Sequence, residues 1–219
     1  MFKALTDCIT GEPYSVDVVT GRQYRRAVCA LAWPWHPLPG CVVALAEHRH
    51  RPTVLGEARH VDVMAEAFST SPEELIRTAD RCMRAFHVAR LVTPDDDNRI
   101  TLIDLENDKR RNERKPYLRT EGPLTWHGKG EGLMPFYTAL LHARISDAKT
   151  LTFGRKSELP TAVQPVIADP KNMDKPMMAW PAVCALCWAV EAIDLSPLPE
   201  WGGADSGMPG GPADAVGGY

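Results

Sequence analysis

The 219-residue sequence lacks the features that would place it in a membrane or outside the cell. Its longest nearly uncharged apolar run, residues 177–190, is shorter than the roughly 20 residues that a membrane-spanning helix needs. No basic segment followed by an apolar one stands at the N-terminus, as a secretion signal would require. The six cysteines are scattered, mostly inside apolar stretches, which is typical of reduced core thiols. These absences predict a cytoplasmic protein with no membrane partner.

Signatures of several enzyme classes are also missing. The chain has no GxxxxGK[ST] motif, which excludes an ATPase motor of the P-loop type. It has one CxxC, Cys184 and Cys187, but no second CxxC or CxxH at the spacing of a zinc finger. Because this pair lies in an apolar segment, we expect two buried thiols. His48 and His50 alternate with arginines near a turn, which favours an exposed polar corner over a metal site.

What the sequence does contain is the composition of a globular domain, since 44% of its residues are hydrophobic and 24% are charged. A chain of this length forms one substantial core more readily than two small ones. We expect an irregular lead-in or loose hairpin over residues 1–23, one domain over 24–194 and a flexible Gly/Pro-rich tail over 195–219.

Apolar runs and turn signals predict the elements of this domain. Strands are expected over residues 24–33, 41–49 and 52–60, and the continuous apolar runs of the first two are typical of strands covered on both faces. Further along the chain, we expect short strands at 100–105 and 151–153 and helices at 133–145 and 181–193. Residues 154–176, which lie between the strand expected at 151–153 and the helix expected at 181–193, are rich in proline and have no predicted element.

Residues 71–97, SPEELIRTADRCMRAFHVARLVTPDDD, predict a capped helix, a short strand and three aspartates. Ser71 can accept a hydrogen bond from the backbone N–H of Glu74, and Pro72 presets the first helical turn. The apolar run 88–92 predicts a strand that ends at a Thr-Pro pair. The aspartates therefore follow a strand, where they either coordinate a divalent cation or form a solvated turn.

A basic run, KRRNERKPYLR, occupies residues 109–119 and includes one aromatic residue, Tyr117. Such a segment can neutralise phosphates while the tyrosine stacks on a base. The alternative is a solvated charged loop, which is the usual role of a charge run. The candidate DNA contacts are Lys109, Arg110, Arg111, Arg114, Lys115 and Arg119.

Three strands, a helix and a fourth strand ending in acids resemble the opening of the ribonuclease H-like fold. Over residues 24–194 the chain is similar to the C-terminal nuclease domain of phage large terminase subunits. The similar segments are SPEELIRTADRCMRAFHVARLVTPD, LMPFYTALLHARISDAKTLTF and AWPAVCALCWAVEAI. The resemblance implies a mixed α/β sheet of ribonuclease H type and a role in DNA packaging, with double-stranded DNA or a packaging or assembly protein as partner.

The resemblance also implies a set of metal-binding acids. In that family, acids on the first strand, at the end of the fourth strand and at the start of the last helix hold two divalent metals, Mg²⁺ or Mn²⁺, for phosphodiester cleavage. Here Asp95 matches the second position, but the first strand, RRAVCALAWPW, has no acid and the last helix starts at Trp180 and Pro181. We therefore expect a catalytically degenerate domain, without a cofactor, that acts in DNA packaging or nucleic-acid binding.

Two alternatives stay open. An active Mg²⁺- or Mn²⁺-dependent DNA nuclease would use Asp95, Asp97 and Asp104, with Asp95 as a metal ligand and Asp174 as a further candidate. A virion or assembly interaction protein would have no nucleic-acid role, because a fold alone does not fix a function.

Overall fold

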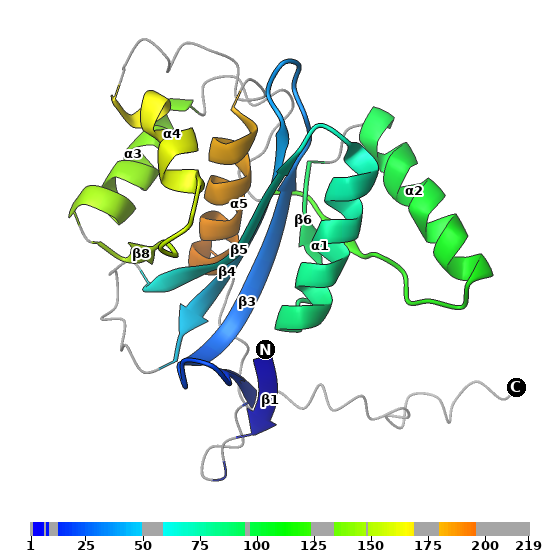
Figure 1. Cartoon of the computed structure of the whole chain (residues 1–219), viewed down its shortest axis with the longest axis horizontal. Helices are drawn as coiled ribbons and strands as arrows, with labels where there is room; N and C mark the ends of the chain where they lie inside the picture. Colours follow the sequence, from blue (N-terminus) through cyan, green and yellow to red (C-terminus); the bar gives the residue numbers. More distant parts are fainter. Residues whose placement is uncertain are drawn as a thin grey trace, which may run out of the picture.

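A mixed β-sheet with helices on both faces forms the centre of the molecule (Figure 1). The computed structural model describes residues 2–6, 8, 13–49, 59–94, 97–123, 134–147, 149–168 and 180–195. The strands are β1 (Phe2–Thr6), β2 (Pro13–Asp17), β3 (Gln23–Ala32), β4 (Gly40–His48), β5 (Val61–Ser69), β6 (Leu91–Val92), β7 (Thr120–Glu121) and β8 (Leu151–Thr152). The helices are α1 (Pro72–Phe86), α2 (Asp97–Asn112), α3 (Met134–His142), its π-helical continuation (Ala143–Asp147), α4 (Leu159–Ala168) and α5 (Pro181–Leu195).

Strand β3 organises the sheet. Strand β4 pairs antiparallel with one edge of β3, and β5 pairs antiparallel with β4. On the other edge, β2 pairs with the start of β3, and β6 runs parallel to its end. Strand β7 then pairs parallel to β6. The strands β3, β4 and β5 are thus antiparallel neighbours, and β6 and β7 run parallel to β3. This is the arrangement of a ribonuclease H-like sheet, and the predicted fold class is confirmed.

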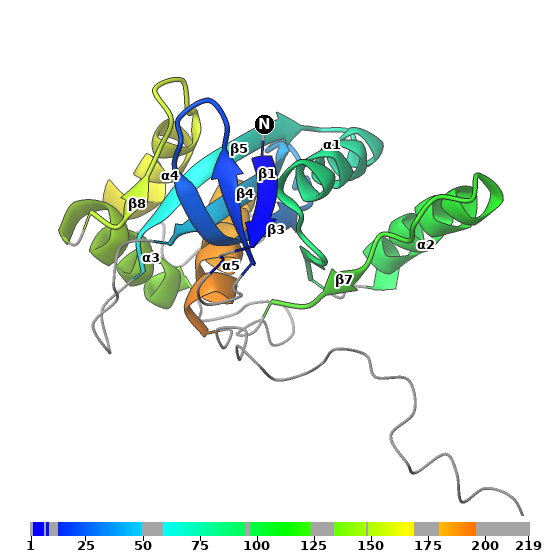
Figure 2. The ribbon, with the colours of Figure 1, turned by 90° about the horizontal axis from the view of Figure 1, so that it is seen from below.

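The sheet separates two cores because side chains alternate between its faces. Ala30 and Ala32 of β3 pack with α5, whereas Cys29 and Leu31 pack with α1. Helices α3, α4 and α5 lie on the first side, and α1 and α2 lie on the second, as two views show (Figures 1 and 2). The continuous apolar runs of β3 and β4 are thus covered on both faces, as predicted.

Local signals fixed helix α1 as predicted. The Ser71 hydroxyl accepts a hydrogen bond from the Glu74 backbone N–H at 3.3 Å, and the helix ends at His87, whose φ of 57° is left-handed. The apolar helix α5 was also predicted, and all its residues from 183 to 190 are buried. The five cysteines of β3, β4, α1 and α5 are buried free thiols, while Cys8 is exposed.

Two of the predicted strands differ from the structure in position or type. The third strand is β5 and begins at Val61; of the range predicted for it, residues 52–58 lie outside the described residues. The prediction missed β5 because Asp62 and Glu66 interrupt its apolar pattern. The strand predicted at 100–105 is wrong, because these residues lie in α2, whose inward side chains follow a helical spacing from Ile103 to Arg110.

Helix α4 lies in the proline-rich segment for which no element was predicted. It carries Pro165 in its interior and buries Leu159, Val163 and Val166. The predicted strand at 88–92 is shorter than expected and covers Leu91 and Val92. At the N-terminus, β1 and β2 form an antiparallel hairpin that joins β3, so the hairpin alternative holds for this segment. None of the described helices is both long and apolar enough to span a bilayer.

Candidate nucleic-acid interface

The acids predicted from the sequence do not form a metal site among the described residues. Asp104 is exposed on α2, and Asp97 begins that helix with a side chain that is not described. Asp95 and Asp174 lie outside the described residues. Within the described ranges, no three His, Cys, Asp or Glu side chains are placed to hold a metal ion together.

Two of the three positions that the resemblance assigns to metal-binding acids, on β3 and at the start of α5, hold no acid here. Strand β3 presents Ala30 and Ala32 to α5. Helix α5 begins at Pro181, and its first acid, Glu191, lies roughly 15 Å further along the helix axis. The residues described at these positions do not fit a two-metal centre, because such a centre needs carboxylates that converge from separate elements.

One group of acids and arginines lies near the C-terminal end of α5 and includes the buried Glu47. Glu47 accepts hydrogen bonds or ion pairs from Arg26 at 2.9 Å and from Arg59 at 3.6 Å. Both arginines also donate to the Ile193 carbonyl in the last turn of α5. Arg144, 1% exposed, pairs with Asp194 and donates to Thr150 Oγ1 at 3.1 Å. The arginine clamp, defined as Arg26, Glu47, Arg59, Arg144 and Asp194, places cations at the negative end of the helix dipole.

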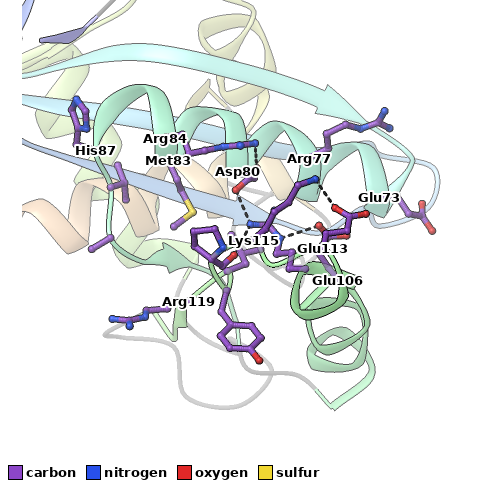
Figure 3. Close-up of a pocket in the computed structure, with 16 residues that line it drawn as sticks. Glu73, Arg77, Asp80, Met83, Arg84, His87, Glu106, Glu113, Lys115 and Arg119 are labelled. Carbon is purple, nitrogen blue, oxygen red and sulfur yellow. Dashed lines mark hydrogen bonds and ion pairs between the residues drawn. The ribbon is translucent and has the colours of Figure 1, made fainter. Parts of the chain in front are cut away.

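A cleft of about 1010 Å³ lies between α1 and the segment that follows α2. Arg77, Arg84 and His87 line it along α1, and Lys115 and Arg119 line it from the other side (Figure 3). We call this surface the basic cleft; its lining also includes Tyr117 and the acids Glu73, Asp80, Glu106 and Glu113. Arg77 and Arg84 are two helical turns apart in the sequence, and this spacing is the local pattern that indicates the α1 wall of the cleft.

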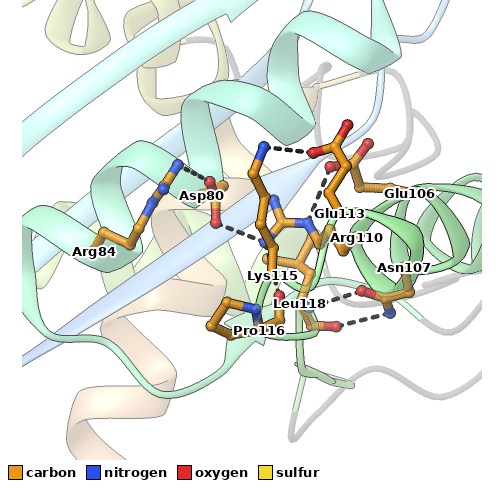
Figure 4. A network of polar contacts seen from close by, with 9 residues as sticks. All are labelled: Asp80, Arg84, Glu106, Asn107, Arg110, Glu113, Lys115, Pro116 and Leu118. Atoms are coloured by element: carbon orange, nitrogen blue, oxygen red, sulfur yellow. Dashed lines mark hydrogen bonds and ion pairs between the residues drawn. The ribbon is translucent and has the colours of Figure 1, made fainter.

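Arg110 forms the floor of the basic cleft (Figure 4). Its guanidinium donates to Asp80 at 2.9 Å, to Glu106 at 3.0 Å and to the Pro116 carbonyl at 3.3 Å. Burial opposes its charge, but the hydrogen bonds to Asp80 and Glu106 outweigh burial and raise the pKa of Arg110. With 8% exposure, Arg110 ties α1, α2 and the following segment together.

Further bonds hold the segment after α2 against the helix. Asn107 donates to the Leu118 carbonyl at 3.1 Å and accepts from the Leu118 N–H at 2.7 Å. The Lys115 N–H donates to the Arg110 carbonyl at 2.9 Å, beyond a left-handed Arg114 with a φ of 55°. The basic segment therefore has a defined backbone, and its first part, residues 109–112, is the last turn of α2 and not a loop.

The other predicted DNA contacts are all exposed: Lys109, Arg111, Arg114, Lys115 and Arg119. Arg111 pairs with Asp108 at 3.1 Å, and Lys115 pairs with Glu113 at 2.5 Å. The hydrogen bond and charge of Lys115 hold the pKa of Glu113 below its usual range. The side chains of Arg114 and Arg119 make no ion pair with any described residue, and neither does that of Arg77 on α1.

The remaining candidate metal ligands are also accounted for. Cys184 and Cys187 are 1% and 0% exposed in the core of α5, as expected for structural thiols. His48 Nε2 lies 3.0 Å from the Asp62 carboxylate, and His50 lies outside the described residues.

No family model matches the sequence, and no curated protein matches it. Among solved structures, the chain is similar to the nuclease domain of the large terminase g2p from bacteriophage SPP1, which was solved with bound Mn. The two share 13% sequence identity with a TM-score of 0.47, over 78% of this chain and 88% of that one.

Proposed function

We propose that this chain is a DNA-binding domain of ribonuclease H-like fold that binds through the basic cleft and does not cleave. The observation that carries the proposal is that four exposed cations line one cleft: Arg77, Arg84, Lys115 and Arg119. Two of them, Arg77 and Arg119, have no ion-pair partner among the described residues. Exposed cations of this kind release counterions from a phosphate backbone when they bind it. Arg110 is not among the proposed contacts, because its guanidinium is buried and paired.

The absence of cleavage is supported by the residues beneath α5. A two-metal nuclease stabilises the attacking and leaving oxygens with two closely spaced ions held by converging carboxylates. The resemblance assigns one of these acids to the first strand and another to the start of the last helix. In this chain the strand position holds Ala30 or Ala32, and the helix position holds Trp180 or Pro181. Asp95 alone would bind a hard cation weakly, because Mg²⁺ sites usually need more than one anionic ligand.

The proposal extends to the setting in which the domain acts. The three segments that resemble terminase nuclease domains support a part in phage DNA packaging within the host cytoplasm. In that role the domain would hold or guide DNA for a separate motor, since the sequence has no P-loop of its own.

Fluorescence anisotropy with a labelled DNA of mixed sequence tests the binding site. The triple variant Arg77→Gln, Lys115→Gln, Arg119→Gln should bind at least tenfold more weakly at low salt, because it removes three exposed cations that line the basic cleft. The matched control is Arg155→Gln, Lys156→Gln, which neutralises two exposed cations in the turn after β8, on the other side of the sheet. Equal loss in both variants, or no DNA binding by the wild type, would refute this site.

A plasmid assay with Mg²⁺ or Mn²⁺ tests the absence of cleavage. The proposal predicts intact supercoiled plasmid after prolonged incubation with either metal. Cleavage that disappears in Asp95→Ala and persists in Asp104→Ala would instead establish a nuclease built around Asp95.

A further inference from the structure

The shape of the basic cleft limits which form of DNA can enter it. Its volume of about 1010 Å³ is close to the upper end of the ~300–1,000 Å³ range of small-ligand pockets. A few nucleotides of an extended strand fit such a space. A duplex is a convex rod whose bases are stacked inside it, so a duplex would touch only the rim.

Tyr117 is the aromatic residue of this cleft and is held ready for contact. Its side chain is 55% exposed, although both of its chain neighbours are anchored. The Pro116 carbonyl accepts a hydrogen bond from Arg110, and both backbone groups of Leu118 bond to Asn107. Leu118 is also 4% exposed and packs in the core beneath α1. The backbone at Tyr117 is therefore ordered before any ligand arrives, which lowers the entropic cost of using its ring.

Cations line the same cleft as this ring. Arg77 and Arg84 project from α1, and Arg119 lines the cleft from the other side (Figure 3), two residues after Tyr117 in the chain. Arg84 pairs with Asp80 but keeps 70% of its side chain exposed, while Arg77 and Arg119 have no ion-pair partner among the described residues. A cleft that combines an exposed aromatic side chain with exposed cations is the arrangement that binds single strands, in which bases stack and phosphates are neutralised.

We infer that the basic cleft binds single-stranded DNA, with a base stacked on Tyr117 and the adjoining phosphates bound by Arg77, Arg84 and Arg119. This inference rests on the proposed DNA-binding function and specifies the form of DNA. It also adds the arginines of α1 to the DNA contacts, whereas the contacts predicted from the sequence all lie in the basic run at 109–119.

Anisotropy titrations of the full chain with a labelled oligothymidine and with a duplex of equal length test the inference. The single strand should bind at least fivefold more tightly than the duplex. Tyr117→Leu should weaken single-strand binding about 5- to 100-fold, the range for loss of one stacked base. Tyr117→Phe keeps the ring and should stay within about threefold of the wild type. The matched control Phe136→Leu removes a ring that is 50% exposed on α3, outside the cleft, and should leave affinity unchanged.

A second variant separates the phosphate contacts from the ring. Arg77→Gln should lower single-strand affinity several-fold and reduce the salt slope by about 0.7, the effect of one lost phosphate contact. Duplex binding equal to or tighter than single-strand binding, or an unchanged affinity in Tyr117→Leu, would overturn the inference and leave the proposed function intact. Failure to bind either form of DNA would overturn both.

Discussion

The arginine clamp and the basic cleft use the same side chain in opposite ways. In the clamp, Arg144 is 1% exposed and its guanidinium bonds to Asp194, Thr150 and the Arg59 carbonyl. In the cleft, Arg77 and Arg119 are exposed and have no ion-pair partner among the described residues. The first group joins the end of α5 to the sheet, and the second leaves its charge available. Burial and pairing, rather than the residue type, separate an arginine that stabilises from one that binds.

The two kinds of arginine should differ in how much stability the protein loses when they are replaced. Removing one partner of a buried ion pair costs about 3–5 kcal/mol, because the other charge stays buried without compensation. Removing an exposed cation costs about 0–1 kcal/mol of stability. Stability and DNA affinity should therefore respond to different arginines. The variants below test this separation from the largest expected effect to the smallest.

Arg144→Met should give the largest loss of stability. It leaves Asp194 and the Arg59 carbonyl without their donor and should lower the free energy of unfolding by about 3–5 kcal/mol. Urea denaturation of this variant and of the exposed control Arg155→Met measures the difference. DNA affinity of the folded Arg144→Met protein should match the wild type. A stability loss below 1 kcal/mol would show that the clamp does not hold α5.

Arg110→Met tests a buried arginine that lies within the basic cleft itself. Because Arg110 bonds to Asp80, Glu106 and the Pro116 carbonyl, the variant should lose about 2–3 kcal/mol of stability, less than Arg144→Met because Asp80 keeps its pair with Arg84. Exposed Arg111→Met should lose less than 1 kcal/mol. Equal stability of the two variants would mean that burial does not distinguish these two neighbouring arginines of α2.

Arg114→Gly should separate stability from binding in the opposite direction. A left-handed conformation costs a residue with a side chain about 1–2 kcal/mol, so glycine should raise stability by about 0.5–1 kcal/mol. The same change removes a free cation and should weaken DNA binding a few-fold. Arg114→Ala serves as control, since it loses the charge without relieving the backbone. A more stable variant with undiminished affinity would exclude Arg114 from the interface.

The sequence predicted elements whose signals are local. Helix α1 followed from a Ser-Pro start and an apolar stripe, and β3 and β4 followed from their continuous apolar runs. Helix α2 was mistaken for a strand because four apolar or β-branched residues in a row look the same in both structures. Its helical spacing emerges only when buried Arg110 is counted with Ile103, and a charged residue is not normally expected inside.

The candidate site was predictable in part for the same reason. The run at 109–119 showed its cations and Tyr117 directly, and the lack of acids in β3 was visible in the sequence. That α1 forms the opposite side of the cleft could not be predicted, because Arg77 and Arg119 are far apart in sequence and line one cleft only through packing. The clamp joins residues from 26 to 194, and no local pattern marks such a set.

The salt dependence of wild-type DNA affinity tests the central claim most directly. If the exposed cations of the basic cleft neutralise about four or five phosphates, a plot of log K against log salt should be linear with a slope of about −3 to −4. The triple variant Arg77→Gln, Lys115→Gln, Arg119→Gln should have a clearly shallower slope. An affinity that does not change between low and high salt would contradict the account, because the cleft would then not be an electrostatic interface for DNA.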